Sequence, residues 1–148
     1  MTPQTKIIYL RHITSTTALI FPVEEICKRA REAGILCIID GAHAPAHVPL
    51  DLSTLDADIY TGACHKWLLA PKGAAFLYVR PELQAWMDPL VVSWGYDAEP
   101  GYGSGKKFLD YHEWQGTRDL AASLAVPAAI DFQREQDWGQ VRTRCREL

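Results

Sequence analysis

The chain has 148 residues, of which 48% are hydrophobic and 22% charged, a composition typical of a folded globular domain. Its formal net charge of −3, with acidic and basic residues interspersed, argues against a nucleic acid or an anionic membrane as a partner. No apolar run approaches the ~20 residues that span a bilayer, and the first residues lack the apolar stretch of a signal peptide. Together with four widely spaced cysteines, which we expect to be free thiols, these features indicate a cytoplasmic protein.

The first part of the chain predicts a strand, a helix and a second strand. Residues 5–10 are a short apolar run rich in β-forming residues, which predicts a buried strand. Pro22 opens a helix whose apolar residues recur with helical spacing until Gly34 ends it. Residues 35–39 are apolar on both faces, as in a parallel sheet covered by helices, and Asp40 ends this second strand. Such a unit is a βαβ motif, for which we expect a right-handed crossover.

The rest of the chain predicts two further strands, at residues 58–64 and 74–79. The turn between them, with Pro71 and Gly73, is too short for a parallel crossover, so this pair should be antiparallel. Residues 93–107 are rich in Gly, Ser and Tyr and predict a loop. Helices are expected over 119–125, 127–132 and from residue 137 onward. The expected fold class is α/β, with a mostly parallel four-stranded sheet and three or four flanking helices.

Polar side chains gather where the predicted strands end. Asp40 ends the second strand and His43 follows three residues later, while His65 and Lys66 follow the third strand. In open α/β sheets, ligands bind outside the carboxyl ends of the parallel strands. Pyridoxal 5'-phosphate (PLP) needs a lysine amine for its imine, a carboxylate to keep its pyridine nitrogen protonated, and a donor for its phenolic oxygen. Lys66, Asp40 and His43 therefore predict a PLP site at this edge of the sheet.

Three short segments carry a family resemblance: DGAHA at residues 40–44, GACHKW at 62–67 and WQGTRD at 114–119. They resemble the class V aminotransferase family of fold-type I PLP-dependent enzymes, in the isopenicillin N epimerase-like branch close to the cysteine desulfurases. The resemblance extends over nearly the whole chain, in the order in which the family carries these segments. It implies the PLP-dependent transferase-like fold of the family's large domain.

The resemblance also implies roles for individual residues. Lys66 would be the Schiff-base lysine and, once displaced by an amino-acid substrate, the general base at the α-carbon. Asp40 would pair with the pyridine nitrogen, and His43 would bond the phenolic oxygen of the ring. His65 would lie beside the cofactor phosphate, and Thr117 would reach the phosphate of the neighbouring subunit across a homodimer interface.

Two departures from the family pattern leave alternatives open. Ala63 stands where the family usually has Ser or Asn, which removes a polar contact near the phosphate. Members of the family are also much longer, so residues 1–148 should form a partial large domain without the family's N-terminal segment and C-terminal small domain. One hypothesis is an isopenicillin N epimerase-like enzyme acting on an amino acid; the other is a truncated, inactive relative that acts as a binding domain or has no function. Epimerisation, transamination, desulfuration and lyase chemistry all stay open.

Four further residues have competing interpretations. His12, beside a loop of Ser and Thr, either lines the site or turns the chain, and Arg118 either meets an anion or makes a surface ion pair. A metal site built on His43 and His47 is disfavoured, because Pro45 interrupts any helix between them and no cysteine pair completes a zinc set. Cys64 is expected to be a small packed residue rather than a nucleophile.

Overall fold

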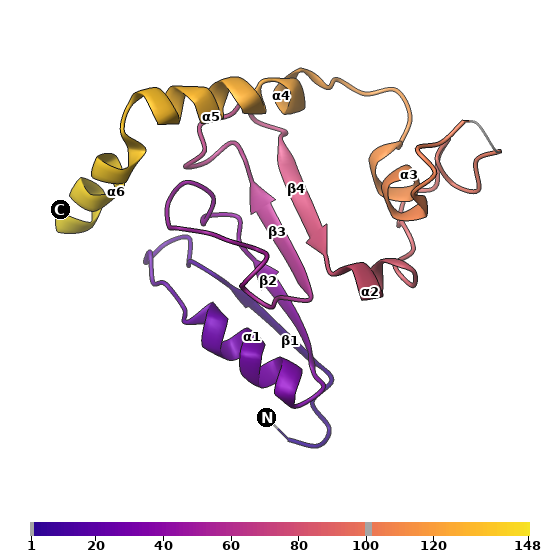
Figure 1. Ribbon diagram of the computed structural model, residues 1–148, viewed down its shortest axis with the longest axis horizontal. Helices are drawn as coiled ribbons and strands as arrows, with labels where there is room; N and C mark the ends of the chain where they lie inside the picture. Colours follow the sequence, from indigo (N-terminus) through magenta and orange to yellow (C-terminus); the bar gives the residue numbers. More distant parts are fainter. Residues whose placement is uncertain (1, 100–101) are drawn as a thin grey trace. The chain divides into compact units, whose positions relative to one another are not determined.

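The computed structural model describes residues 2–99 and 102–148 and divides the chain into two compact units (Figure 1). Unit 1 contains the residues up to Tyr78 together with Ala121–Leu148, and unit 2 contains Val79–Leu120. Of the residues predicted to hold a cofactor, all lie in unit 1 except Thr117.

A four-stranded sheet with the order β1–β2–β3–β4 forms the centre of unit 1. Its first three strands, β1 (Ile7–Arg11), β2 (Leu36–Asp40) and β3 (Ile59–Ala63), are parallel to one another. The fourth strand, β4 (Ala75–Val79), runs opposite to β3 in Figure 1. The mostly parallel sheet with an antiparallel last strand is therefore confirmed, and the predicted strand bounds differ from the observed ones by only one or two residues.

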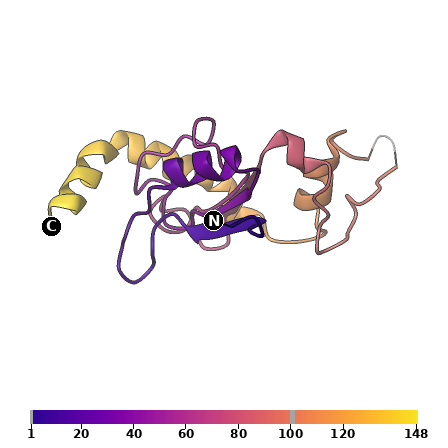
Figure 2. The ribbon, with the colours of Figure 1, turned by 90° about the horizontal axis from the view of Figure 1, so that it is seen from below.

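Helix α1 (Val23–Glu32) covers one face of the sheet, as Figures 1 and 2 show. Val23, Cys27 and Ala30 recur with helical spacing and are fully buried. On the exposed side of the helix the Arg29 guanidinium pairs with the Glu25 carboxylate at 2.6 Å, one helical turn apart. The helix ends where predicted, because Gly34 adopts a φ of +65° that favours glycine.

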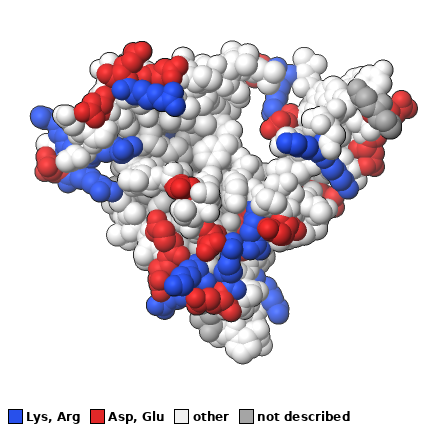
Figure 3. All heavy atoms as spheres, in the orientation of Figure 1, with Lys and Arg blue, Asp and Glu red and all other residues white. Residues whose placement is uncertain are grey.

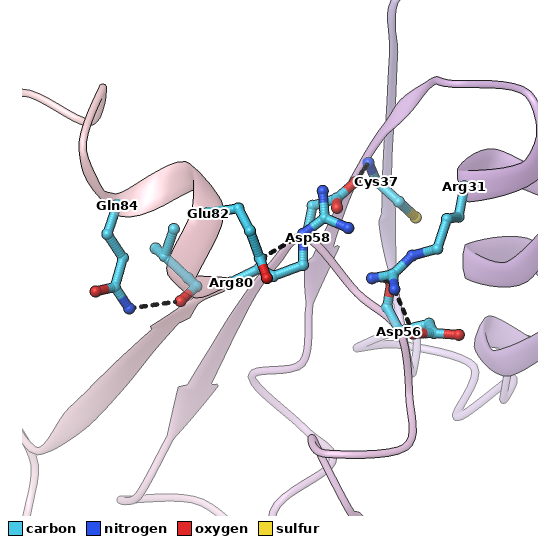
Figure 4. Close-up of polar contacts among 8 residues, drawn as sticks. Arg31, Cys37, Asp56, Asp58, Arg80, Glu82 and Gln84 are labelled. Atoms are coloured by element: carbon cyan, nitrogen blue, oxygen red, sulfur yellow. Dashed lines mark hydrogen bonds and ion pairs between the residues drawn. The ribbon is translucent and has the colours of Figure 1, made fainter.

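Two buried contacts to β2 and one exposed ion pair hold the crossover and the segment before β3 in place. Sγ of Cys27 lies 3.4 Å from Sγ of Cys37, which joins α1 to the sheet. A carboxylate oxygen of Asp58, a buried residue, accepts a hydrogen bond of 2.8 Å from the backbone N–H of Cys37 (Figure 4). Arg31 pairs with Asp56 at 2.7 Å and also donates to its carbonyl oxygen. These bonds fix where the chain enters β3, and so where β3 ends and the next loop begins.

Three helices close unit 1: α4 (Ala121–Leu124), α5 (Val126–Glu135) and α6 (Trp138–Glu147). Pro127 lies in the first turn of α5, where a missing N–H costs no hydrogen bond. The segment between β3 and β4 buries small side chains against α4 and α5, forming an apolar cluster of Cys64, Ala70, Ala74, Ala122, Val126 and Ala129. The helices of the C-terminal segment therefore support the stretch of chain that carries Lys66.

Unit 2 contains two short helices, α2 (Pro81–Gln84) and α3 (Lys107–Glu113). The Tyr111 hydroxyl donates to the Asp97 carboxylate, and a Cβ at Gly95 would overlap the backbone of α3. The expectation of three or four helices was wrong, since the described part of the chain has six. Both helices of unit 2 were missed because α2 has only four residues and α3 follows a Gly-rich loop without an apolar repeat.

The surface carries charges of both signs. Figure 3 shows acidic and basic side chains mixed over the region of α1, in keeping with the interspersed charges of the sequence. Among the described residues, no helix is both long enough and apolar enough to cross a membrane.

Candidate cofactor site

The predicted site lies at the carboxyl ends of β1, β2 and β3. Arg11 and Asp40, the last residues of β1 and β2, are register partners, and Asp40 is in register with Thr61 in the middle of β3. Backbone bonds continue past them: the N–H of His12 donates to the Asp40 carbonyl at 2.9 Å, and the N–H of Gly41 donates to the Thr61 carbonyl at 2.9 Å. The Asp40 carboxylate is half-buried and accepts a hydrogen bond of 3.0 Å from the Ala42 N–H. This bond holds the carboxylate in place at the strand end.

Lys66 and His43 meet at this edge of the sheet. Nζ of Lys66 lies 2.9 Å from Nε2 of His43, and both residues are half-buried. Burial lowers the pKa of His43, the positive charge of Lys66 lowers it further, and the negative charge of Asp40 opposes them. His43 is therefore neutral at pH 7, and its Nε2 accepts a hydrogen bond from the Lys66 ammonium group.

A buried polar pair supports the turn after β2. Nδ1 of His12 lies 2.9 Å from the Tyr60 hydroxyl, and both residues are buried. Burial lowers the pKa of His12 and raises the pKa of Tyr60, which favours the neutral form of both groups. A Cβ at Gly41 would overlap the Tyr60 ring, so the turn requires glycine there. The side chain of His12 is thus a buried partner of Tyr60, and whether the Ser and Thr loop beside it lines the site stays open.

The other predicted residues are placed as follows. His65 is exposed, with Nδ1 3.4 Å from the Ala74 carbonyl oxygen. Ala63 and Cys64 are buried; Cys64 follows the last residue of β3 and packs in the apolar cluster, as expected for a small structural residue. Thr117 is exposed in unit 2, and its predicted phosphate contact stays a prediction.

Arg118 also belongs to unit 2, where Nη2 donates to the Glu113 carbonyl at 3.0 Å. Nη1 of Arg118 also donates to Oε1 of Gln115, two residues after α3, at 3.4 Å. The role of Arg118, at an anion or in a surface ion pair, stays open.

Sequence reasoning missed four residues that support the two site loops. The His47 ring stacks on the Trp67 ring with centroids 3.9 Å apart and planes 12° apart. Nε2 of Gln133 donates to the Trp67 carbonyl at 2.9 Å, and Nε1 of Trp138 donates to the Ala46 carbonyl at 2.8 Å. Because Gln133 and Trp138 lie far along the chain in α5 and α6, no local pattern could have revealed these contacts.

The donor set fits PLP. An amine, a carboxylate and a neutral imidazole occupy one edge of the sheet, and they match the aldehyde, the pyridine nitrogen and the phenolic oxygen of that cofactor. Metal ligation fits less well, because the described residues contain no group of three or more His, Cys, Asp or Glu side chains arranged to hold an ion.

Comparison with known proteins gives matches along the whole chain. Residues 1–148 match the family model for Aminotransferase class-V. An isopenicillin N epimerase from Streptomyces clavuligerus is 45% identical over 158 residues, covering 100% of this chain and 39% of that protein. A probable cysteine desulfurase from Xylella fastidiosa is 30% identical over 149 residues, covering 100% of this chain and 36% of that protein. The solved structure of a cysteine desulfurase from Escherichia coli matches with a TM-score of 0.79 at 26% identity, covering 95% of this chain and 35% of that one.

The chain thus spans about two fifths of the length of the two isopenicillin N epimerases that it matches, 39% of each. The structural match confirms the expected PLP-dependent transferase-like α/β fold. With a family model that matches from end to end and a fold that agrees, the chain belongs to the class-V aminotransferase family, whose members are PLP-dependent enzymes.

Proposed function

We propose that this chain forms the PLP-binding part of an enzyme that acts on an amino acid, with Lys66 holding the cofactor covalently. The observation that carries the proposal is the 2.9 Å contact between Nζ of Lys66 and Nε2 of His43, at the strand ends where Asp40 also lies. When bound, PLP draws electrons away from the α-carbon of an amino acid, which makes the α-proton acidic. The side chains of Lys66, His43 and Asp40 would bind and orient the cofactor and transfer the protons.

Each of the three residues has a distinct task in this proposal. The Lys66 amine must lose its proton before it can act as a nucleophile, and the His43 imidazole, 2.9 Å from it, would bond the phenolic oxygen of the ring. The Asp40 carboxylate, held by the Ala42 N–H, would keep a proton on the pyridine nitrogen. His65 and Thr117 are proposed for the phosphate, the latter across a homodimer interface.

The relatives favour one reaction among those left open. The two curated relatives at 45% and 42% identity are both isopenicillin N epimerases. We therefore propose an epimerase-like reaction, in which Lys66 Nζ removes the proton from one face of the α-carbon of an amino acid and a second acid delivers a proton to the opposite face. Cysteine desulfuration is the competing reaction, because probable cysteine desulfurases are also relatives, at 29% to 32% identity.

A second candidate is an inactive relative that binds a partner or has no function. It is favoured by Ala63, which is only 7% exposed and offers no polar group where the family usually has one. Cofactor capture by the chain separates the two candidates, since an inactive relative that has lost its site would not retain PLP.

Trapping the covalent bond tests the proposal. The chain is incubated with PLP, reduced with borohydride and digested, and the peptides are analysed by mass spectrometry. We expect the modification at Lys66, its loss in Lys66→Ala, and its retention in the control Lys72→Ala, since Lys72 lies exposed on the turn before β4. Modification spread equally over surface lysines would contradict the proposal.

A further inference from the structure

Lys66 and His43 lie on separate loops, and a pair of stacked rings, one from each loop, connects these loops. Lys66 lies on the segment after β3, and His43 lies on the turn after β2. The neighbouring residue Trp67 extends its ring from the first loop, and His47 extends its ring from the second. The two rings stack with centroids 3.9 Å apart and planes 12° apart.

The stack reaches His43 through a further hydrogen bond. Nδ1 of His47 lies 3.2 Å from the carbonyl oxygen of His43, so the imidazole that stacks on Trp67 also donates to the backbone of His43. A continuous path of contacts therefore runs from Lys66 through its neighbour Trp67 and the His47 ring to His43. The side chains of Lys66 and His43, the first and last residues of this path, are also in direct contact, from Nζ of Lys66 to Nε2 of His43.

Two side chains from the C-terminal helices donate hydrogen bonds to the backbone of the two loops that carry the stacked rings. Gln133 of α5 is 8% exposed and donates to the Trp67 carbonyl at 2.9 Å. Trp138 of α6 donates to the Ala46 carbonyl, directly before His47, at 2.8 Å. Each loop thus accepts one hydrogen bond close to its stacked ring: one loop at Trp67 itself, the other at Ala46, the residue before His47.

The loops need this support because their backbones are held in an unfavourable conformation. Ala46 has a φ of +65° and Leu69 a φ of +67°, a region that residues other than glycine rarely adopt. Such conformations persist only where surrounding contacts impose them. The hydrogen bond to Ala46 and the contacts of Trp67 lie within two residues of these positions.

We propose that His47 and Trp67 are positioning residues, clamped by Gln133 and Trp138, that hold the Lys66 amine against the His43 imidazole. This inference rests on the proposed function for its purpose, since the distance matters only if Lys66 is the reactive amine. The clamp acts through Lys66 and His43 and touches no reacting atom itself.

The test uses the titration of His43 in the chain without cofactor, followed by nitrogen–proton NMR. Lys66, His47 and Arg11 lower the pKa of His43 and Asp40 raises it, with burial the largest cause. Opening the clamp moves the Lys66 charge away and admits water, so the pKa of His43 rises toward the ordinary histidine value. The His43 signal is assigned by its loss in His43→Gln.

Three substitutions probe the clamp, with a matched control on the same helix. Trp67→Ala removes the stack and Gln133→Leu removes one donor; both should raise the pKa of His43, while Trp67→Phe, which keeps a ring, should restore it. Phe132→Leu is the control, because Phe132 is 47% exposed and adjacent to Gln133. If circular dichroism shows that Trp67→Ala does not fold, the pKa of His43 in Gln133→Leu alone tests the clamp.

An unchanged pKa of His43 in folded Gln133→Leu, and in Trp67→Ala where it folds, would overturn the clamp. Because this titration needs no PLP, its result is independent of the proposed function. If PLP does bind, the pH midpoint of its visible absorption band gives a second readout, which should shift in Gln133→Leu and not in Phe132→Leu. A chain that fails to bind PLP but shows the His43 shift would keep the clamp and reject the proposed function.

Discussion

Nε2 of His43 and Nζ of Lys66 lie 2.9 Å apart although 23 positions separate these residues in the sequence. The parallel arrangement of β2 and β3 brings them together, because both residues follow the carboxyl ends of neighbouring strands. Asp40, the last residue of β2, completes the group. A sheet edge that gathers an amine, an imidazole and a carboxylate makes specific predictions about cofactor binding and stability.

Asp40→Asn should weaken PLP binding by roughly tenfold to a hundredfold, because a hydrogen bond to a charged group contributes about 1.5–3 kcal/mol and about 1.4 kcal/mol is a factor of ten. The amide keeps the shape of the side chain but cannot hold a proton on the pyridine nitrogen. Affinity is measured by titrating the visible absorption of bound PLP. Asp51→Asn, at an exposed turn of the same unit, is the control and should bind like the unmodified chain. Equal affinities in both variants would remove Asp40 from the site.

The free energy of unfolding should fall as pH drops below the ordinary histidine pKa. Burial lowers the pKa of His12, and the charge of Glu24 opposes this in part. Near and below pH 6.5 the unfolded chain therefore binds more protons at His12 than the folded chain does. The free energy of unfolding then falls by at most about 1.4 kcal/mol per pH unit for this histidine, until the pH reaches its pKa in the folded chain. His43 adds an effect of the same sign.

Urea unfolding at about pH 7.5 and about pH 5.5, on either side of the histidine range, measures this loss. His12→Gln should be less stable at the higher pH but show a shallower loss on acidification, because one of the two neutral histidines is gone. A pH dependence as steep in His12→Gln as in the unmodified chain would show that His12 titrates normally in the folded state.

Gly41→Ala should destabilise the chain by about 1–3 kcal/mol, the usual cost of overpacking a filled core. The added methyl would overlap the Tyr60 ring, which is fully buried and tied to His12 by a hydrogen bond of 2.9 Å. Gly139→Ala is the control: it lies in α6, where a Cβ would meet only Asp137 at an ordinary 3.5 Å. That variant should gain roughly 0.5–1 kcal/mol from helix propensity. Chemical denaturation compares the two, and equal stabilities would contradict the packing beneath the turn.

Only Cys145 should react rapidly with a thiol reagent in the folded chain. Cys27, Cys37 and Cys64 are buried, and burial raises the pKa of Cys64. The bond to Cys37 and burial raise the pKa of Cys27; the same bond lowers the pKa of Cys37, but this side chain is only 1% exposed and a reagent does not reach it. Stopped-flow reaction with Ellman's reagent should show one fast thiol, absent in Cys145→Ser, and all four after denaturation. A second fast thiol in the native chain would place one of the buried residues at the surface.

Periodicity and turn residues predicted the sheet, α1 and the residues at the strand ends. An apolar run of about five residues is long enough to define a strand, and Gly34 and Asp40 mark element ends by local chemistry alone. The edge shared by Asp40, His43 and Lys66 could be predicted because parallel strands always present their carboxyl ends together. The segment resemblance then supplied the roles of the three residues.

Contacts between distant segments could not be predicted in the same way. Gln133 lies 66 positions from Trp67, and Trp138 lies 92 positions from Ala46. Neither side chain has a local signature, since a glutamine or tryptophan on a helix usually faces solvent or core without a fixed partner. Helix α3 was not predicted for another reason. It has seven residues and only one buried side chain, Tyr111, so its sequence shows no apolar repeat of helical period.

The measurement that tests the central claim most directly is the visible absorption spectrum of the purified chain with PLP, compared with that of Lys66→Ala. We predict a band of protein-bound PLP that is absent in Lys66→Ala, disappears on borohydride reduction and is unchanged in Lys72→Ala. A spectrum of free PLP only, or a band equally strong in Lys66→Ala, would contradict the assignment of Lys66 as the residue that holds the cofactor.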